Sequence, residues 1–536
     1  MSRLIQAPPE GRPTSHRRAP RHHYRRLLAV LILLTVGVVL WRAGVFGSLL
    51  DDEGTAAGTV APNGPEVPND AAPDPSLSPS TSAPPSPSPP TANTPGPINT
   101  AFPGLTTFRG NATRSYYGEG PGPSDPRILW RYPESGGLCS ESTNLGVTKV
   151  WCGTGWTGQP NVIEHEDGSL ELRFGAYDGH YHFLDARTGK PMRDDLVTGD
   201  LAKGSASTDP DGFPLYYGGS RDNYLRIVAL DRPQPEVLWS VNADNAPNPV
   251  WNDDWDGAPL ILGDYMLEGG ENSWFYVIKL NRSYDARGLV QVDPQIRMLV
   301  PGYDEQLFSD VGDEDVSIES SISFFDGVAY FVNSGGLVQG WDVSDVLNGG
   351  DDHERVFRFW AGDDSDGSVV IDEQGFLYVA RHGSRSTARD RELGDLIKLD
   401  PKKPNDPVVW SVPVTRGSAE GGGIWATPAL YGEIVYMTTN YGEVLAVNRN
   451  TGNVLWTIDL PGPLWGSPVP IDGQLIVGDC DGGLHGFDIT DPRQPPPELW
   501  QIDLEGCIES TPAVWEGMVF VGTRGGPMYA IGDAVS

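Results

Sequence analysis

The chain has 536 residues, a net charge of -34 and a hydrophobic content of 38%. This apolar content excludes a wholly disordered chain, and the acidic excess argues against a general nucleic-acid-binding protein, which needs clustered Lys and Arg. Glycine and proline together make up about a fifth of the residues, which favours short strands and turns over long helices.

The first 50 residues have the pattern of a membrane anchor. Residues 1–26 contain seven Arg and one acidic residue, and residues 27–50 form an apolar run that only Arg42 interrupts. A spanning helix needs about 20 apolar residues, and an Arg near its end can extend to the lipid headgroups. We therefore predict a basic cytoplasmic tail at 1–26 and an uncleaved transmembrane signal-anchor helix at 27–50.

A cleaved signal peptide is the alternative interpretation, since the apolar core of such a peptide spans about 7–15 residues. The long basic segment before the run and the lack of a small-x-small site after it favour the anchor. Basic residues on one side and Asp51, Asp52 and Glu53 on the other orient the N-terminus toward the cytoplasm. The rest of the chain, with 30 basic and 71 acidic residues after residue 42, is then predicted to lie outside the cytoplasm, in the cell envelope.

Residues 51–100 are predicted to form a disordered stalk. Residues 61–100 contain 13 Pro and no Lys or Arg. A segment of this composition cannot bury a core and extends as a polyproline-like spacer. A PxxP ligand is the second interpretation, and an exported location favours the spacer.

Four cysteines follow the stalk, at positions 139, 152, 480 and 507. An even number in an exported domain predicts disulfide bonds, and the spacings do not match a zinc site. Three connectivities are open. The pairs nearest in sequence, Cys139–Cys152 and Cys480–Cys507, are the preferred ones.

A four-residue pattern recurs eight times: one variable residue, two small residues, then Pro or another compact residue. The copies begin at Thr157, Lys203, Asp256, Glu319, Asp366, Trp425, Trp465 and Glu509. Two hydrophobic runs separated by a turn follow each copy, and alternation within the runs indicates antiparallel strands. Most repeats add a run that ends near Trp239, Trp360, Trp410, Trp456 or Trp500. Four strands per repeat at this spacing predict the blade of a β-propeller.

The last repeat stops without its fourth strand, and a matching run, Pro126–Tyr132, precedes the first repeat. Trp130 stands at the position of the repeated Trp. An open ring would leave unpaired strand edges, which an N-terminal strand in the last blade removes. We therefore predict an all-β, eight-bladed β-propeller of four-stranded antiparallel blades over residues 101–536, closed by this strand.

One repeat also carries a family motif. The segment Ala446-Val-Asn448-Arg-Asn-Thr451-Gly452-Asn-Val-Leu-Trp456 resembles the tryptophan-docking repeat of the pyrroloquinoline-quinone (PQQ) propeller superfamily, A-x-D-x-x-T-G-x-x-x-W. Asn448 replaces the Asp of that motif, and other repeats keep parts of it. The resemblance implies the fold but leaves the activity open, because the superfamily includes dehydrogenases and non-enzymatic envelope proteins such as the Bam-complex lipoprotein.

The variable position of the pattern predicts a candidate site. The small residues after it begin the innermost strands, where eight chains crowd around the axis, so the variable residues should ring one mouth of the channel. The candidate ligand-binding residues of this funnel are Lys203, Asp256, Glu319, Asp366, Trp425, Trp465 and Glu509. Such a set suits a small molecule or a cation. The plainer interpretation is that the acids are hydrated or paired with Arg221, Arg381 or Arg524.

Other catalytic and metal patterns are scarce. No histidine lies in an HExxH motif or beside a G-x-S-x-G elbow, and His180 with His182 gives two ligands without a third. Two D-D-x-D-G segments, 253–257 and 363–367, do not match an EF-hand and are interpreted as acidic turns. The sequence therefore predicts no catalytic residue and no metal site.

We expect a non-enzymatic, membrane-anchored propeller that needs no cofactor and acts as a binding or assembly scaffold for a protein or other cell-envelope component. The second hypothesis is a PQQ-dependent dehydrogenase, with Trp425 or Trp465 stacking on the cofactor and Glu319 or Glu509 helping to bind Ca²⁺. The adjacent-cysteine disulfide of many PQQ alcohol dehydrogenases is absent from the sequence. The third hypothesis is an envelope sensor that binds sugar or polymer through the funnel tryptophans.

Overall fold

The computed structural model describes residues 96–534 except 145, 157, 386 and 415–421. The predicted tail (1–26), anchor helix (27–50) and nearly all of the stalk (51–100) lie outside these residues. In the described part, no helix has the length and apolar character needed to cross a membrane. The helices that it contains are short: η2 (Ala243–Asn245), α2 (Glu305–Val311), α3 (Ser344–Leu347) and α4 (Ala388–Glu392).

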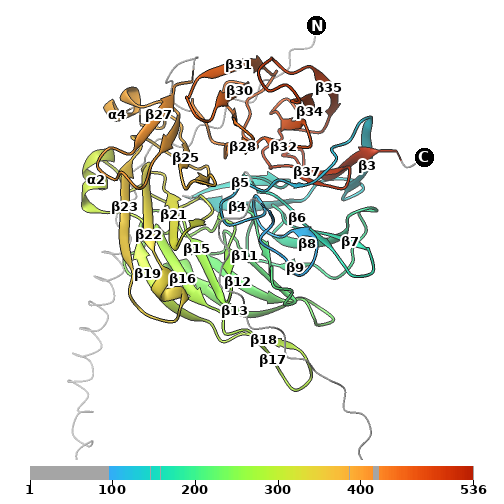
Figure 1. Ribbon diagram of the computed structural model, residues 1–536. Coiled ribbons are helices and arrows are strands. Elements are labelled where there is room, and N and C mark those ends of the chain that lie inside the picture. Colours follow the sequence, from blue (N-terminus) through green and yellow to red (C-terminus); the bar gives the residue numbers. More distant parts are fainter. Residues whose placement is uncertain (1–95, 145, 157, 386, 415–421, 535–536) are drawn as a thin grey trace, which may run out of the picture. The chain divides into compact units, whose positions relative to one another are not determined.

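Eight antiparallel sheets follow one another around one axis in chain order (Figure 1), which confirms the predicted eight-bladed propeller. Blade 1 contains β6 (Asn161–Glu164), β7 (Leu170–Gly175), β8 (His180–Asp185) and β9 (Leu196–Val197). Blade 2 contains β10 (Ser207–Thr208), β11 (Leu215–Gly219), β12 (Tyr224–Ala229) and β13 (Glu236–Asn242). Blade 3 contains β14 (Leu260–Leu262), β15 (Tyr265–Gly269), β16 (Trp274–Lys279) and β19 (Gln295–Pro301), with a hairpin of β17 (Ser283–Tyr284) and β18 (Val290–Gln291) between the last two.

The same order of strands continues through the second half of the ring. Blade 4 contains β20 (Ser323–Phe325), β21 (Val328–Val332), β22 (Leu337–Asp342) and β23 (Glu354–Trp360). Blade 5 contains β24 (Val370–Ile371), β25 (Leu377–Ala380), β26 (Leu396–Leu399) and β27 (Val408–Val412). Blade 6 contains β28 (Ala429–Tyr431), β29 (Ile434–Thr438), β30 (Glu443–Asn448) and β31 (Val454–Asp459). Blade 7 contains β32 (Val469–Ile471), β33 (Gln474–Gly478), β34 (Gly483–Asp488) and β35 (Glu498–Asp503).

Blade 8 is completed by the N-terminal strand, as predicted. It contains β36 (Ala513–Trp515), β37 (Met518–Gly522), β38 (Met528–Asp533) and β3 (Pro126–Tyr132), which pairs antiparallel with β38. The indole of Trp130 donates from Nε1 to the Ala186 carbonyl in blade 1. A Cβ on Gly189 would lie 2.7 Å from the Trp130 ring, so glycine is needed where the two blades meet.

A β-bulge in the outer strands sets the position of the docking aromatic residues. In blades 5, 6 and 7 the bulge immediately precedes Trp410, Trp456 and Trp500. The indole Nε1 of Trp456, for example, donates to the Pro492 carbonyl of the next blade at 3.0 Å. In blade 4 the residue after the bulge is Phe357, and Trp360 instead donates to the Gly335 carbonyl.

A belt of hydroxyl groups explains the third residue of the repeated pattern. In most blades its hydroxyl accepts a hydrogen bond of 2.9–3.4 Å from the backbone N–H of the equivalent residue in the preceding blade. The acceptors are Ser205, Ser321, Ser368, Thr427, Ser467 and Thr511. Gln159, which stands at a position that is small in the other copies, donates instead to the carbonyl of Pro512 in blade 8 and accepts from the Arg109 N–H.

The segment 104–123 forms an N-terminal strap along the inner strands. It includes β1 (Gly104–Leu105), which pairs with β6, and β2 (Gly118–Glu119), which pairs parallel with β36. Its other hydrogen bonds reach blades 2 to 7, at Thr208, Ala258, Ile322, Ile371, Leu430 and Gln474. Because these contacts lie farther along the inner strands than the variable residues, the strap closes the end of the channel opposite the predicted mouth.

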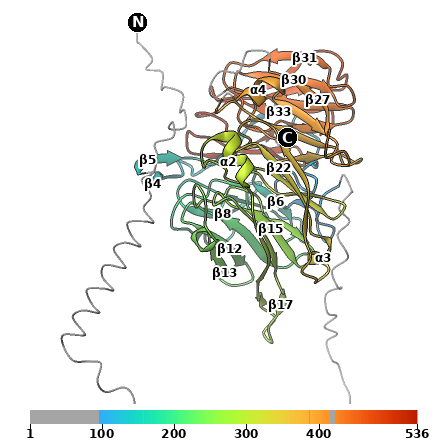
Figure 2. The ribbon, with the colours of Figure 1, turned by 90° about the vertical axis from the view of Figure 1, so that its left-hand side faces the viewer.

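Both preferred disulfides are present, so the predicted pairings are confirmed. Cys139 and Cys152 join the ends of a hairpin made of β4 (Cys139–Asn144) and β5 (Val147–Cys152), which stands out from the blades (Figure 2). Cys480, after the second strand of blade 7, is bonded to Cys507, which precedes the inner strand of blade 8. The second bond therefore links neighbouring blades.

Candidate functional site

The predicted funnel residues meet at one mouth of the channel. Residues from neighbouring blades touch there: Lys203 Nζ lies 2.6 Å from Asp256 Oδ2, and the rings of Trp425 and Trp465 are 4.7 Å apart. Contacts also cross between distant blades, because Trp156 of blade 1 donates to Glu319 of blade 4 at 3.0 Å. Thr157, the variable residue of blade 1, lies outside the described residues.

A second ring of side chains lines the same mouth. Of its members, only Arg221 and Arg524 were expected there, as possible partners of the funnel acids. In blades 2 to 8, a residue that follows the second strand donates its backbone N–H to the carbonyl two positions before the variable residue. In blade 1 the equivalent N–H, that of Tyr177, donates to the Gly153 carbonyl. The residues at this position are Tyr177, Arg221, Glu271, Ser334, His382, Asn440, Cys480 and Arg524. Their constant place after the second strand is a signal that counting along the repeats would have found.

The side of the mouth formed by blades 2 and 3 is a buried ion cluster. Lys203 Nζ lies 3.2 Å from Asp254, 2.6 Å from Asp256 and 2.9 Å from Glu271, and Arg221 pairs with Asp254 at 3.0 Å. Although burial lowers the pKa of Lys203, the three carboxylates raise it well above its ordinary value. The ammonium is therefore a fixed internal counter-ion, and these funnel acids are paired.

Blade 5 repeats this cluster with one change. Asp364 and Asp366 occupy the positions of Asp254 and Asp256, and His382 occupies that of Glu271. His382 Nε2 lies 3.1 Å from Asp366 Oδ2 and 3.5 Å from Asp364 Oδ2. All three residues are at most 5% exposed. Residues 254–257 and 363–367 are buried, so the acidic residues of these two segments lie inside the mouth and not on an exposed surface.

Three tryptophans form an aromatic surface beside the blade 5 cluster, here named the tryptophan platform: Trp156, Trp425 and Trp465. The ring of Trp425 lies between the other two, 5.4 Å from Trp156 and 4.7 Å from Trp465, and His382 meets it edge-on at 5.5 Å. All three indoles are partly exposed. Trp156 was not predicted because it stands outside the four-residue pattern. Its backbone has a positive φ of 42°.

The remaining funnel residues are held by polar partners. Glu319 accepts hydrogen bonds from Trp156 and from Ser317, and Glu509 pairs with Arg524 at 3.1 Å. Trp151 of the β4–β5 hairpin packs against the guanidinium groups of Arg221 and Arg524, which brings that hairpin to the mouth. Arg381 does not join the funnel acids, because it is buried in an ion pair with Asp390 of α4.

The histidine pair of β8 is an ion-paired group. His182 is 2% exposed, and its ring nitrogens lie 3.2 Å from Asp178 and 3.1 Å from Asp195. Burial lowers the pKa of His182, but hydrogen bonds and the charges of the two aspartates raise it to about 9. His182 is therefore a protonated clamp between carboxylates at neutral pH.

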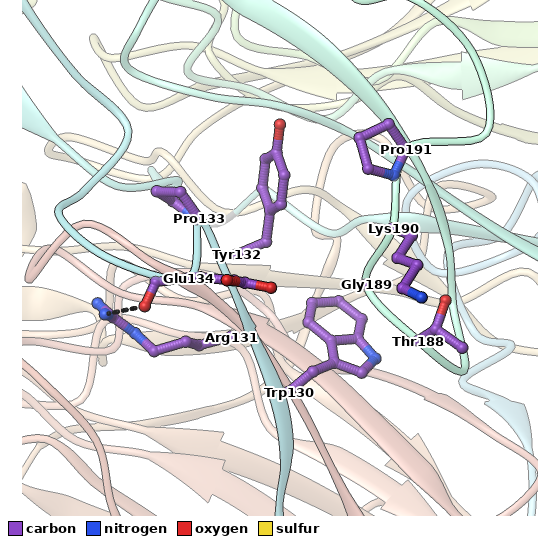
Figure 3. Close-up of a pocket in the computed structure, with 9 residues that line it drawn as sticks. All are labelled: Trp130, Arg131, Tyr132, Pro133, Glu134, Thr188, Gly189, Lys190 and Pro191. Atoms are coloured by element: carbon purple, nitrogen blue, oxygen red, sulfur yellow. Dashed lines mark hydrogen bonds between the residues drawn. The ribbon is translucent and has the colours of Figure 1, made fainter.

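A groove of about 350 Å³ lies away from the mouth, where β3 of blade 8 meets the turn after β8 of blade 1 (Figure 3). It is lined by Trp130, Arg131, Tyr132, Pro133, Glu134, Thr188, Gly189, Lys190 and Pro191. Arg131 donates to the Glu134 carbonyl within it. The groove is formed by the docking of Trp130 on Gly189, which is a structural contact between blades.

Comparisons with known proteins agree with this architecture. Residues 392–494 match a family model described as outer membrane protein assembly factor BamB. A europium-containing methanol dehydrogenase is 12% identical, with a TM-score of 0.53 over 82% of this chain and 99% of the other. The quinohemoprotein alcohol dehydrogenase ADHIIG from Pseudomonas putida HK5 is 11% identical, with a TM-score of 0.53 over 82% and 81%. The chain has a PQQ-like propeller fold.

The predicted resemblance to PQQ-like propellers is therefore confirmed. A third similar structure, the quinohemoprotein alcohol dehydrogenase of Comamonas testosteroni, is 12% identical, with a TM-score of 0.51 over 81% of each chain. No curated protein matches the sequence of this chain. At 11–12% identity these structures share the fold alone, so the activity has to be argued from the mouth.

The described residues do not fit the PQQ and Ca²⁺ arrangement of the second hypothesis. Trp425 is packed between Trp156 and Trp465 instead of presenting an isolated ring for a planar cofactor. Either Glu319 or Glu509 was expected to help bind Ca²⁺, but Glu319 accepts a hydrogen bond from Trp156 and Glu509 pairs with Arg524. The PQQ-like fold is thus present without the cofactor geometry that the hypothesis required.

Proposed function

We propose that the chain is a membrane-anchored, extracytoplasmic β-propeller that acts as a binding or assembly scaffold in the cell envelope, with its mouth as the binding surface. The tryptophan platform is the observation that carries this proposal. Three partly exposed indoles in contact supply a large apolar area with few rotatable bonds, which is typical of binding hot spots. The anchor at 27–50 and the stalk at 51–100 would hold this surface outside the cytoplasm.

The surroundings of the platform favour binding over catalysis. The lysine and arginines of the mouth are paired with carboxylates, and the strap closes the far end of the channel. The mouth therefore behaves as a preorganised surface and not as a passage. The BamB-type family match, residues 392–494, covers the two blade entrances that carry Trp425 and Trp465, which supports a protein partner in the envelope.

Site-directed exchange of the platform tests this function. The double variant Trp425→Ala/Trp465→Ala and the wild-type chain are compared for co-purification of envelope components after cross-linking in intact cells. We expect one component to be retained by the wild type and lost from the double variant. The control Leu499→Ala, which removes an exposed apolar side chain from the outer strand β35 of blade 7, should retain the component. Equal retention by all three would contradict a platform-dependent scaffold.

A cofactor titration tests the competing hypothesis on the same protein. With PQQ and Ca²⁺ we expect no rise in the melting temperature and no dye-linked oxidation of alcohols or sugars. Saturable stabilisation together with substrate oxidation would replace the scaffold proposal with an enzyme.

A further inference from the structure

The β4–β5 hairpin lies over one side of the mouth and forms a sheet of its own. Within the described part of the chain, β4 and β5 pair with each other and with no other strand. Residues 147–150 of β5 are exposed, Val147 at 54% and Val150 at 63%. A two-stranded hairpin is only marginally stable by itself in water. Its order in this protein therefore depends on its disulfide and on its contacts with the blades.

Ser140 and Trp151 hold the hairpin to the blades. Ser140 Oγ donates to the Tyr177 carbonyl at 2.6 Å. The Trp151 ring meets the Tyr177 ring edge-on at 5.9 Å, and it lies 5.1 Å from the guanidinium carbon of Arg221 and 4.8 Å from that of Arg524. Cations over an indole face are attracted by the ring. The hairpin therefore covers the two arginines of the second ring through a single side chain.

The base of the hairpin is fixed more firmly than its strands. Leu138, which is 4% exposed, donates its N–H to the Gly526 carbonyl in blade 8 and accepts from the Gly153 N–H. Cys139 and Cys152 come directly after this base and lie opposite each other in the ladder. The disulfide is thus placed where the anchored base passes into the exposed strands.

The second disulfide lies in different surroundings. Cys480 donates its N–H to the Pro463 carbonyl, and the Cys507 carbonyl accepts from the Arg524 N–H. Both of these cysteines are partly buried, whereas Cys139 is exposed. Exposed disulfides are the ones that external thiols reduce most readily. The blades hold Cys480 and Cys507 in place by backbone bonds, and the hairpin has no such support beyond its base.

We propose that the β4–β5 hairpin is a lid on the mouth and that the Cys139–Cys152 disulfide is its reducible lock. With the bond formed, the hairpin is ordered and Trp151 covers Arg221 and Arg524. With the bond broken, the hairpin gains conformational entropy when it unfolds, so the indole leaves the two arginines. The lid rests on the proposed function, because it would control access to the binding surface.

Thiol–disulfide exchange with an external dithiol opens the lock. A thiolate of the dithiol attacks the exposed Cys139 sulfur, the S–S bond breaks, and Cys152 leaves as a thiolate that takes up a proton. The second thiol of the dithiol then displaces Cys139, which is protonated in turn, and closes a disulfide in the reductant. The protein gains two electrons and two protons, and the dithiol loses the same.

Reduction of the folded full-length chain with dithiothreitol, followed by alkylation and mass spectrometry, tests the lock. We expect Cys139 and Cys152 to be alkylated at least about tenfold faster than Cys480 and Cys507 in the same molecules. Hydrogen exchange of amides 140–151 should then accelerate while β37 and β38 stay protected, and oxidised glutathione should reverse the change. Equal alkylation of the two disulfides, or unchanged exchange in the hairpin, would overturn the proposal.

Labelling with phenylglyoxal, an arginine reagent, tests whether the hairpin covers the mouth. Arg524 should react at least about fivefold faster in the reduced chain and in the variant Cys139→Ser/Cys152→Ser. Arg127, whose side chain is 58% exposed, is the matched control and should react at an unchanged rate. If the variant does not fold, the reduced wild type decides. Unchanged labelling of Arg524 would show that the hairpin is no lid. Because no partner is used, this result would leave binding at the tryptophan platform untouched.

Discussion

The two ends of the propeller channel are built from the same eight repeats but carry different chemistry. At the closed end, one strap contacts every blade, and most of its partners there are backbone groups, with side chains such as those of Gln159 and Gln474 as exceptions. At the mouth, the corresponding ring positions hold Lys, Asp, Glu, Trp, Arg and His side chains. Backbone hydrogen bonds do not depend on the side chain, so most of the strap contacts tolerate different residues, whereas the mouth differs from blade to blade through its side chains.

The closed end also shows how charge can serve structure alone. Arg114 is fully buried and donates to the carbonyls of Ala258, Ile322 and Phe108. It thereby ties the strap to blades 3 and 4. The ion pairs at the mouth instead join side chains from neighbouring blades, so they fix the shape of the binding surface.

Removing the strap arginine should have the largest effect. Arg114→Ala leaves buried carbonyls without donors and opens a cavity, so we expect a loss of about 5 kcal/mol in the free energy of unfolding. Urea denaturation measures it, and Arg127→Ala, at a 58% exposed side chain, is the matched control with almost no effect. A loss below about 1 kcal/mol would mean that the strap does not hold the ring.

Loss of the lysine in the ion cluster at the mouth should have the second-largest effect on stability. Lys203→Met leaves Asp254, Asp256 and Glu271 without their ammonium, and we expect a loss of about 4 kcal/mol at pH 7. The loss should shrink toward pH 5, because burial raises the pKa of Asp256 well above its ordinary value and its protonation relieves the repulsion. Lys190→Met, at an exposed lysine, should change stability little at either pH. A pH-independent loss would argue that packing and not charge is responsible.

His182 in β8 of blade 1 should make the free energy of unfolding depend on pH. The pKa of His182 is raised to about 9 in the folded protein from 6.5, so its stabilisation is complete below about pH 6.5 and is lost as the pH rises through 9. Between these limits we expect the wild type to lose on the order of 3 kcal/mol through this group. His182→Gln should remove that slope in denaturation curves recorded from pH 6 to 10, and an unchanged slope would contradict the assignment.

The smallest stability effect is expected on the tryptophan platform. Trp465→Ala should cost less than about 1 kcal/mol, because the ring is partly exposed. Trp456→Ala, nearby in the sequence but 5% exposed in the core between blades, should cost about 3–5 kcal/mol. Thermal denaturation distinguishes them. Similar losses for both would make the platform a packing feature.

Much of the fold could be predicted from the sequence because its signals are local and repeated. The four-residue pattern, the strand alternation and the run Pro126–Tyr132 together predicted eight blades and their closure, which β3 confirms. The strap could not be predicted in this way. Its buried arginines bond to residues 144 to 318 positions away, and its own sequence contains no copy of the repeat.

Only part of the candidate site could be predicted, because only its variable residues belong to the repeated pattern. Counting repeats placed Lys203, Asp256 and Trp425 at one mouth, but it did not say which acids would be paired. The second ring, with Glu271 and His382, lies after the second strand of each blade, and its side chains follow no common residue type. The pairing of Lys203 with three carboxylates is absent from any motif, so it could be found only in the structure.

Photo-cross-linking in intact cells tests most directly the claim that one end binds and the other is closed. A photoreactive side chain is placed at Glu141 of the mouth hairpin or at Glu119 of the strap, both of which are exposed. We expect a discrete adduct from position 141 that disappears in the Trp425→Ala/Trp465→Ala chain, and none from position 119. An adduct from position 119 alone, or one from position 141 that survives loss of both tryptophans, would contradict it.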